Sequence, residues 1–337
     1  MTAPTQPAPV SDGHVRWGIL ATGGVAHLFA KDLLLHGHRI TAVGSRSRER
    51  AEGFARAFDI PRVHRSYDAL VDDPEVDVVY VATPHHLHAA NAVAALGHGK
   101  HVLVEKAFTR NESEARDIVE FAERSHLLVM EAMWPRFLPH MAFLRSVLDN
   151  RKIGAVRSLH ADHTQSLPAD PHHRLNDPAL AGGALLDLGV YPISFAHAVL
   201  GAPLEVTAVG NLRPSGVDYA VATIMRHTGG ALSTSYSSME TRGTNTASVL
   251  GTEGHIDIGS VWYTPTDVQV FDAEGHFTDR FESNVSGRGM QYQAAEMERL
   301  IHLGETASQL MRPEDSISVM RTMDHIRKEI GVRYPGE

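Results

Sequence analysis

The sequence predicts an α/β protein: a doubly wound parallel sheet comes first, and an α+β domain with a large, mainly antiparallel open sheet follows. Two observations predict this class. Short apolar runs alternate with helical patterns as far as residue 131, which is typical of a parallel sheet with crossover helices. Beyond residue 156, several runs alternate apolar and polar residues with period two, which is typical of half-buried antiparallel strands. We therefore expect a flexible tail over 1–12, a first domain over 13–133 and a second over 134–337.

Composition argues against several classes of protein and partner. The 337 residues suffice for two domains with sizeable cores. Lys and Arg number 31 against 40 Asp and Glu, so the net charge is −9, and neither nucleic acid nor an anionic membrane surface is expected as the main partner. Without cysteine, disulfides and thiolate metal sites are excluded. The sequence predicts no membrane span, and residues 1–12 lack the basic start and apolar core of a signal peptide, so we expect a cytoplasmic protein.

The first strand and the first helix are joined by a turn of small residues. Val15–Leu20 predicts the strand, and the turn then reads A-x-G-x-x-A where the dinucleotide-binding fingerprint has G-x-G-x-x-G/A. Gly23 allows the backbone to approach a pyrophosphate, whereas Ala21 departs from the usual glycine of the tight turn. The turn residues expected to bind the cofactor are Ala21, Thr22, Gly23, Gly24 and Val25. The alternative is a turn that holds no ligand.

The end of the second strand predicts which nicotinamide cofactor is bound. Arg39–Gly44 is followed by Ser45, Arg46 and Ser47, about twenty residues after the glycine turn, where this fold places the adenosine ribose. An acidic residue there accepts from a ribose 2′-hydroxyl, whereas hydroxyls and an arginine suit a 2′-phosphate. We therefore expect NADP, with NAD less favoured. The alternative is that Arg46 and Arg48 only begin a solvated helix.

Further cofactor residues are expected at the carboxyl ends of later strands, because ligands of doubly wound sheets bind there. Strands over Val76–Ala82 and His101–Val104 are each followed by polar residues. The expected cofactor-binding residues are Thr83, Pro84, His85, His88, Glu105 and Lys106. The 22 histidines form no clean ligand set, so we expect no metal site.

The second domain combines an open sheet with a helix that carries two polar residues. Period-two runs predict strands over Val156–Gln165, Leu204–Leu212, Tyr219–Arg226, Ala231–Met239, Thr246–Leu250, His255–Ile258, Asp267–Phe271 and Phe277–Phe281. In a helix that begins at Gly182-Gly183, Asp187 and Tyr191 are four apart and share a face, where they can line a site. A core helix with one satisfied Asp is the alternative. The uncovered face of the sheet carries Ala, Val, Thr, Tyr and Met, so we expect a homodimer through it.

Several stretches together resemble one enzyme family. They are WGILATGGVA, VYVATPHHLHAANAVAALGHGKHVLVEKAF, EAMWPRFLP and GGALLDLGVYPI. From Val15 to Tyr334 the chain resembles the glucose–fructose oxidoreductase/inositol dehydrogenase (Gfo/Idh/MocA) family, and within it the branch of NADP-dependent dihydrodiol dehydrogenases and D-xylose 1-dehydrogenases. The resemblance implies a Rossmann domain, a substrate-binding domain, and a small-molecule sugar, polyol or cyclic diol as substrate.

The resemblance also implies site residues. The family's catalytic lysine falls on Lys106, its tyrosine or histidine on Tyr191, and its nearby acid on Asp187. The implied substrate residues are these three together with Trp134, Arg136 and Phe137, whose aromatic members form an apolar wall. We expect Tyr191 to exchange a proton with the substrate hydroxyl, Lys106 to orient that hydroxyl and favour the phenolate, and Asp187 to hold the pair or a sugar hydroxyl. The roles of Lys106 and Tyr191 can be exchanged.

The main prediction is an NADP-dependent oxidoreductase that transfers a hydride between a carbinol of a sugar or cyclic diol and the nicotinamide. One alternative is a catalytically silent NADP-binding regulatory protein, and another is a cofactor-assisted glycosidase on the same scaffold. The presence of Lys106, Asp187 and Tyr191 favours the enzyme. Ala107 stands where the family has proline, so we expect a trans peptide bond before it, since a cis bond costs ~2.5–4 kcal/mol at a non-proline residue.

Overall fold

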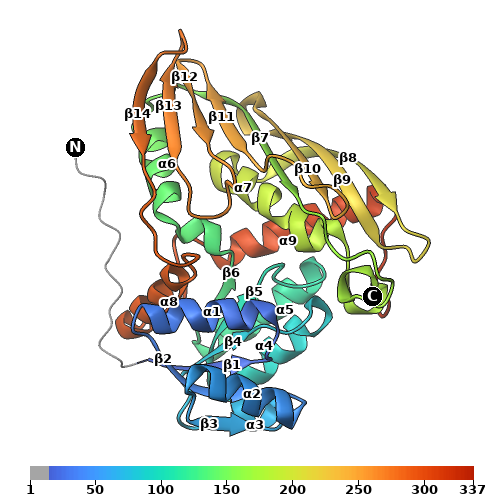
Figure 1. The fold of residues 1–337 in the computed structure, drawn as a ribbon. Coiled ribbons are helices and arrows are strands. Elements are labelled where there is room, and N and C mark those ends of the chain that lie inside the picture. Colours follow the sequence, from blue (N-terminus) through green and yellow to red (C-terminus); the bar gives the residue numbers. More distant parts are fainter. Residues whose placement is uncertain (1–14) are drawn as a thin grey trace. The chain divides into compact units, whose positions relative to one another are not determined.

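A computed structural model describes residues 15–337, and the tail expected over 1–12 lies outside the described residues. The chain forms two compact units, both drawn in Figure 1. The parallel-sheet unit comprises the described residues up to Trp134 and the returning segment Ser286–Ile317. The open-sheet unit comprises Pro135–Val285 and Ser318–Glu337. The sequence predicts one boundary at residue 134, whereas the structure returns a later segment to the first unit.

The returning segment carries α8 (Gln291–Leu303), which a buried carboxylate ties to the rest of its unit. Glu298 Oε1 accepts hydrogen bonds from Trp17 Nε1 and His38 Nδ1, both at 2.8 Å. All three side chains are buried. Because these partners lie 281 and 260 residues from Glu298 in the sequence, no local pattern indicates the pairing.

The parallel-sheet unit has the doubly wound strand order β3-β2-β1-β4-β5-β6, in which every neighbouring pair is parallel. Its strands are β1 (Arg16–Leu20), β2 (Arg39–Gly44), β3 (Arg62–His64), β4 (Val78–Val81), β5 (His101–Glu105) and β6 (Val129–Ala132). Its helices, besides α8, are α1 (Gly24–Leu35), α2 (Arg48–Phe58), α3 (Tyr67–Val71), η1 (His85–Leu87), α4 (His88–Gly97) and α5 (Glu112–Ser125). The central strands are almost wholly buried, which confirms the predicted parallel sheet.

The open-sheet unit contains eight strands in the order β14-β13-β12-β11-β7-β10-β9-β8. β7 and β10 pair in parallel, and the other neighbours are antiparallel. The strands are β7 (Val156–Thr164), β8 (Pro203–Leu212), β9 (Asp218–His227), β10 (Leu232–Ser238), β11 (Ala247–Gly251), β12 (Gly254–Ile258), β13 (Val268–Asp272) and β14 (Phe277–Phe281). Each corresponds to a strand predicted from the period-two alternation.

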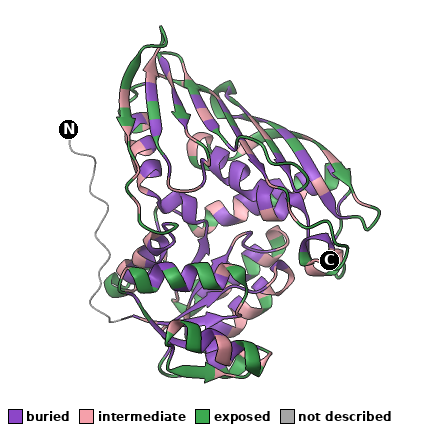
Figure 2. Ribbon diagram, viewed as in Figure 1, coloured by how far each residue is buried: buried purple, intermediate pink, exposed green. Residues whose placement is uncertain are grey.

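Helices cover one face of this open sheet. They include α6 (Pro139–Asp149), α7 (Val190–Leu200) and α9 (Pro313–Ile330). α7 packs on β7 and β10, while Glu329 of α9 accepts from the Ala208 N–H of β8 at 2.5 Å. Figure 2 shows the strands alternating between buried and exposed residues, whereas α7 is almost wholly buried. The segment Pro178–Leu200 is apolar and long enough to cross a membrane, but 89% of its most apolar window is buried inside the protein, as in a core helix.

Candidate active site

The turn between β1 and α1 leaves the N-terminus of a helix open. Gly23 is the N-cap residue, and the first turn of α1 contains no acidic side chain. A Cβ added at Gly23 or Gly24 meets no described atom within 4 Å. Packing within the protein therefore gives no reason for glycine at these positions. Glycine would, however, let a phosphate approach the backbone N–H groups closely.

Ala21 adopts a backbone conformation that favours glycine. Its φ is 91°, and its N–H donates to the Gly44 carbonyl at 2.9 Å. The sequence identified Ala21 as a departure from the fingerprint, and the positive φ gives the physical reason for the usual glycine. The turn keeps its shape here despite the added Cβ.

The end of β2 presents two hydroxyl groups beside an exposed arginine. The Ser45 hydroxyl accepts from the Ser47 N–H at 3.2 Å, and the Ser47 hydroxyl caps α2 by accepting from the Arg50 N–H at 3.3 Å. Both hydroxyls keep a proton to donate. Arg46 forms no ion pair with any acidic side chain in the described part of the chain, and its guanidinium lies 6.0 Å from the Tyr67 ring centre. This group of donors fits a phosphate.

Arg48, by contrast, already has a partner. Its Nε lies 2.6 Å from Glu52 Oε1 on the same helix face. The helix alternative, raised for both arginines from the sequence, therefore describes Arg48 better than Arg46. Of the two, Arg46 has the more available charge.

Two strand ends are joined by His88. Its Nε2 lies 2.8 Å from the Thr83 carbonyl and its Nδ1 lies 2.9 Å from the Ala107 carbonyl. Two carbonyl acceptors suit a doubly protonated ring, whereas burial lowers the pKa of His88. The ring is 1% exposed, so burial prevails and a neutral ring donates to one carbonyl at a time. His88 thus contacts the backbone of both strand ends, and its predicted contact with the cofactor stays a prediction.

The neighbouring residues of this loop are also packed against the protein. Thr83 is buried, and its hydroxyl accepts from Asn91 Nδ2 at 3.1 Å. Pro84 precedes η1 as its N-cap residue. His85 is buried, and its ring meets that of His88 edge-on at 5.5 Å between centres.

The backbone from Lys106 to Phe108 is held at every residue by a buried ionisable side chain. Glu105 accepts from the Lys106 N–H at 3.2 Å, His88 lies at hydrogen-bond distance from the Ala107 carbonyl, and Glu131 accepts from the Phe108 N–H at 3.2 Å. Glu105 is buried, so its carboxylate fixes the loop, and its predicted contact with the cofactor stays a prediction. The Lys106 side chain is partly exposed at the carboxyl end of β5.

The peptide bond between Lys106 and Ala107 is cis, so the expected trans bond is wrong. The expectation rested on the general preference of non-proline peptides. In the structure, Ala107 and Phe108 are buried, and the contacts of their own backbone groups with His88 and Glu131 decide the conformation.

In the open-sheet unit, Asp187 and Tyr191 lie at the start of one helical segment. The segment opens with the π-helical turn η5 (Leu185–Gly189), which carries Asp187, and continues as α7, which carries Tyr191. A regular α-helix was expected, but the π turn changes the direction of the first side chains. Asp187 Oδ1 accepts from Arg174 Nη2 at 3.2 Å, and Tyr191 is 7% exposed.

Two aromatic neighbours of Tyr191 were missed from the sequence. The His163 ring of β7 lies edge-on to Tyr191 at 4.8 Å between centres and packs on the Tyr263 ring at 3.8 Å. The Gln165 amide donates to His163 Nε2 at 2.8 Å. His163 occupies a buried position in the period-two pattern of β7, and a polar residue at such a position was an available signal. Tyr263 lies outside the strands and had no such signal.

The segment Trp134–Phe137 forms the short helix η2 and is buried. Arg136 Nε donates to the Ser194 hydroxyl at 3.0 Å, and Arg136 Nη2 donates to the Ser194 carbonyl at 2.9 Å. The guanidinium thus binds α7, and the predicted contact of Arg136 with the substrate stays a prediction. Phe137 is 1% exposed and acts as a core residue. The Arg288 guanidinium lies over the Trp134 ring at 5.5 Å.

One group of potential metal ligands occurs among residues 15–337: Asp272, Glu274 and His276, at an exposed hairpin turn. Asp272 Oδ1 accepts from the backbone N–H groups of both other residues. These contacts give the carboxylate a structural role in the turn.

Comparison with known families agrees with this geometry. Residues 15–133 match the oxidoreductase family with an NAD-binding Rossmann fold, and residues 141–257 match the GFO/IDH/MocA C-terminal domain. The chain belongs to the GFO/IDH/MocA oxidoreductase family. As a member of that family, it is an NAD(P)-dependent oxidoreductase, and the fit of the glycine turn to a nucleotide phosphate agrees with a nicotinamide cofactor.

Relatives of this GFO/IDH/MocA member include two trans-1,2-dihydrobenzene-1,2-diol dehydrogenases. That of Sus scrofa is 35% identical over 332 residues, and that of Homo sapiens is 33% identical over 330 residues. Both alignments cover 95% of this chain and 98% of the relative. A solved 3-ketoreductase from Actinomadura kijaniata, in complex with NADP and TDP-benzene, has a TM-score of 0.83 at 28% identity, covering 95% of this chain and 99% of that one. A levoglucosan dehydrogenase has the same fold, with a TM-score of 0.83 at 22% identity.

Proposed function

We propose that this oxidoreductase uses NADP and acts on a CH–OH group of a sugar or a cyclic diol. The observation that carries the proposal is the fixed backbone at Lys106. Three buried ionisable side chains, Glu105, His88 and Glu131, hold the loop that carries this lysine. Burying ionisable groups is costly, and a protein that only bound a cofactor would gain little from such precision at a lysine.

Each step of the proposed reaction is assigned to a group whose chemistry suits it. A bound nicotinamide supplies the hydride acceptor or donor. We assign proton exchange with the substrate hydroxyl to the phenol of Tyr191, while the ammonium of Lys106 orients that hydroxyl and favours the phenolate. Asp187, paired with Arg174, would bind a further hydroxyl of the substrate.

Two features favour the substrate class and the cofactor. The relatives named above are dehydrogenases of a cyclic diol, and the similar ketoreductase was crystallised with NADP and a nucleotide. Arg46, with Ser45 and Ser47, offers donors for a 2′-phosphate at the end of β2. We therefore propose NADP over NAD as cofactor and a sugar or a cyclic diol as substrate.

The test is turnover of a defined panel. Purified protein is mixed with NADP or NAD and with aldoses, inositols and trans-dihydrodiols, and the nicotinamide absorbance is followed. Lys106→Met should lower kcat by roughly 10²–10⁴-fold while NADP affinity is retained. Lys31→Met, at an exposed position of α1, is the matched control. NADP binding without turnover of any panel member would favour a silent regulator, and glycoside cleavage without net cofactor reduction would favour the glycosidase.

We also propose that the open face of the eight-stranded sheet pairs with a second copy. Exposed apolar side chains gather on it: Val209 is 72% exposed, Ile224 56% and Tyr236 44%. A hollow of about 650 Å³ on this sheet is lined by β7, β9, β10, β11 and β12, with His160 and Asp162 among its charged and titratable residues. A mixed apolar and polar face of this kind suits a two-fold contact with itself.

A further inference from the structure

A buried carboxylate lies at the start of the helix that carries Asp187 and Tyr191. Asp218 is the first residue of β9 and is 0% exposed. Its Oδ2 accepts from the Leu185 N–H at 2.6 Å, and the adjacent Ala184 N–H also lowers the pKa of this carboxyl. These N–H groups are among those that a helix start leaves without an intrahelical partner. A strand 33 residues further along the chain therefore caps this helix.

The glycine pair before the helix makes this contact possible. Gly183 has φ 133°, and a Cβ added there would lie 2.1 Å from Asp218 Oδ1. A Cβ added at Gly182 would lie 2.5 Å from the Leu175 carbonyl oxygen. Any side chain at Gly183 would push the carboxylate away from the helix start. The Gly-Gly pair of the family motif thus has a local physical purpose in this chain.

The capped turn sets the direction of the residues that follow. η5 is π-helical, and the Asp187 N–H donates back to the Gly183 carbonyl at 3.2 Å. The backbone of Asp187 is therefore hydrogen-bonded to the capped turn. Tyr191 lies in the first turn of α7, which follows it. A shift of the helix start would rotate both side chains, since each residue added to or lost from the turn changes the direction of the next.

We propose that Asp218 is a positioning residue, which fixes the start of this helix and thereby the directions of Asp187 and Tyr191. The proposal rests on the proposed function, because that function assigns both side chains to the reaction. Asp218 itself acts through the helix and touches no reacting atom in this scheme.

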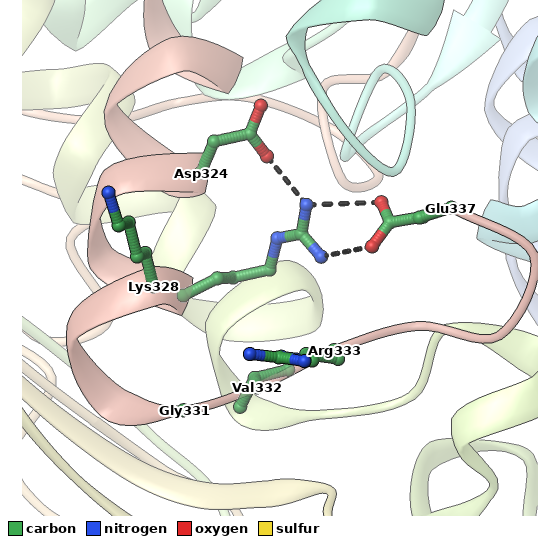
Figure 3. A pocket seen from close by; sticks show the side chains of 7 residues that line it. Asp324, Lys328, Gly331, Val332, Arg333 and Glu337 are labelled. Atoms are coloured by element: carbon green, nitrogen blue, oxygen red, sulfur yellow. Dashed lines mark hydrogen bonds and ion pairs between the residues drawn. The ribbon is translucent and has the colours of Figure 1, made fainter.

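Nearby positive charge compensates the negative charge of the Asp218 carboxylate only in part. The charge of Arg327 in α9 lowers the pKa of Asp218, but the Arg327 guanidinium is already bound by Asp324 at 2.7 Å and Glu337 at 2.8 Å (Figure 3). Tyr334, also buried, has its pKa raised above the usual range, first by burial and then by the charge of Asp218.

On the strand side, the charged neighbours form a separate pair. Arg213 lies 3.2 Å from Glu240 and packs over the Tyr219 ring. Among residues 15–337, Asp218 Oδ1 has no hydrogen-bond partner. Burial accordingly raises the pKa of Asp218 to about 6, although the backbone N–H groups of Leu185, Asp218 and Ala184 act in the opposite direction. While the carboxyl stays buried, the helix-start N–H groups bind its ionised form better than its protonated form, so the cap should loosen as the pH falls through this value. Complete unfolding exposes the carboxyl, so its contribution to global stability has the opposite sign.

Hydrogen exchange of the full chain tests the cap without any need for activity. Amide protection at 184–188, corrected for intrinsic exchange, is measured from about pH 5 to about pH 8. We expect wild-type protection to fall on the acid side of about pH 6. In Asp218→Asn, protection should be lower at the basic end and lack this step. Flat wild-type protection across the range would overturn the proposal, and the wild-type series suffices if the variant does not fold.

A second carboxylate of the same construction provides the matched control. Asp32 Oδ2 accepts from the Met290 N–H at 2.9 Å at the start of α8, and a Cβ at Gly287 would lie 2.5 Å from Asp32 Oδ1. Asp32→Asn should loosen α8 but leave the protection of 184–188 unchanged. A change there would mean that the effect of Asp218→Asn is general loosening of the fold, which would overturn the specific role.

Turnover completes the test. We expect Asp218→Asn to lower kcat roughly tenfold or more with little change in the KM for NADP. The reason is that displacement of Asp187 and Tyr191 should slow the reaction without weakening cofactor binding. It should also remove an acid-side decline of kcat near pH 6. Wild-type kcat in a variant whose cap has loosened would overturn the positioning role. If wild-type protein turns over no substrate, the proposed function fails, and the exchange data still decide whether Asp218 caps the helix.

Discussion

The phenolic hydroxyl of Tyr80 donates a hydrogen bond to the carboxylate of Glu105. Both side chains are buried, on the neighbouring strands β4 and β5. The other carboxylate oxygen accepts from the Lys106 N–H at 3.2 Å. A buried acid at the end of a strand is therefore explained by two donors that it binds at once, one of which is the backbone of the proposed active-site lysine.

Glu105→Gln should lower kcat by roughly 10- to 100-fold with little change in NADP affinity. Once the amide oxygen has accepted from Tyr80, the NH₂ group faces the Lys106 N–H, so two donors oppose each other and the loop must shift. Steady-state kinetics and NADP titration measure the two effects. Glu123→Gln, at an exposed position of α5, is the control. Unchanged kcat in folded Glu105→Gln would refute a positioning role for this carboxylate.

Arg46→Ala should reduce the preference for NADP over NAD by about 10- to 100-fold, because one charge-assisted hydrogen bond to the phosphate is worth about 1.5–3 kcal/mol. The measurement is kcat/KM for both cofactors. Arg48→Ala is a close control, since Arg48 pairs with Glu52 and should not contact the cofactor. Wild-type protein that prefers NAD would contradict the assignment, and an effect confined to Arg48→Ala would move the phosphate site.

Sequence patterns predicted the strands of the open sheet, but they did not reveal the partners of the buried polar side chains. Strands depend on local periodicity, and the eight strands of the open sheet were all predicted. The roles of Asp218 and Glu298 depend on partners 33 and more residues away, which no local pattern reveals. Family resemblance indicated Arg136 but could not reveal that its guanidinium binds α7. Such roles come from tertiary packing.

Ala21→Gly should raise the free energy of unfolding by about 1 kcal/mol. A non-glycine residue at positive φ costs about 1–3 kcal/mol, and the added freedom of glycine in the unfolded chain removes about 0.5–1 kcal/mol of the gain. Urea unfolding provides the measurement. Ala26→Gly, inside α1, should have the opposite sign, since glycine destabilises a helix interior. A loss of stability in Ala21→Gly would show that φ 91° is not strained at this turn.

Ile224→Glu should convert the proposed dimer into a monomer, because the carboxylate would be placed in an apolar contact between two copies. Light scattering at micromolar concentration should give about twice the chain mass of 36.8 kDa for wild type and about that mass for the variant. Leu303→Glu, at a 60% exposed position of α8, is the control and should leave the mass unchanged. A wild-type mass near 36.8 kDa would contradict the proposed contact.

Two buried groups, His140 and Asp218, should change the free energy of unfolding with pH in opposite directions. His140 is 1% exposed, its Nε2 donates to the Trp262 carbonyl at 3.1 Å, and burial lowers its pKa from 6.5 to about 4. The folded state therefore loses stability as the pH falls from 6.5 towards 4, because the unfolded chain takes up the proton first. Burial raises the pKa of Asp218 from 3.8 to about 6, so its contribution is present at low pH and is lost as the pH rises through that window.

When one group is replaced, the effect of the other on the change of unfolding free energy with pH should become visible. Each shift corresponds to about 3 kcal/mol at its full extent. His140→Gln keeps a donor for the Trp262 carbonyl but cannot ionise, so between about pH 4 and pH 6 its stability should rise less with pH than that of wild type. Asp218→Asn should rise more steeply over the same range, because the cost of ionising a buried carboxyl is gone. Urea unfolding across this range measures both slopes. Profiles parallel to wild type would mean that the two groups titrate alike in the folded and unfolded chains.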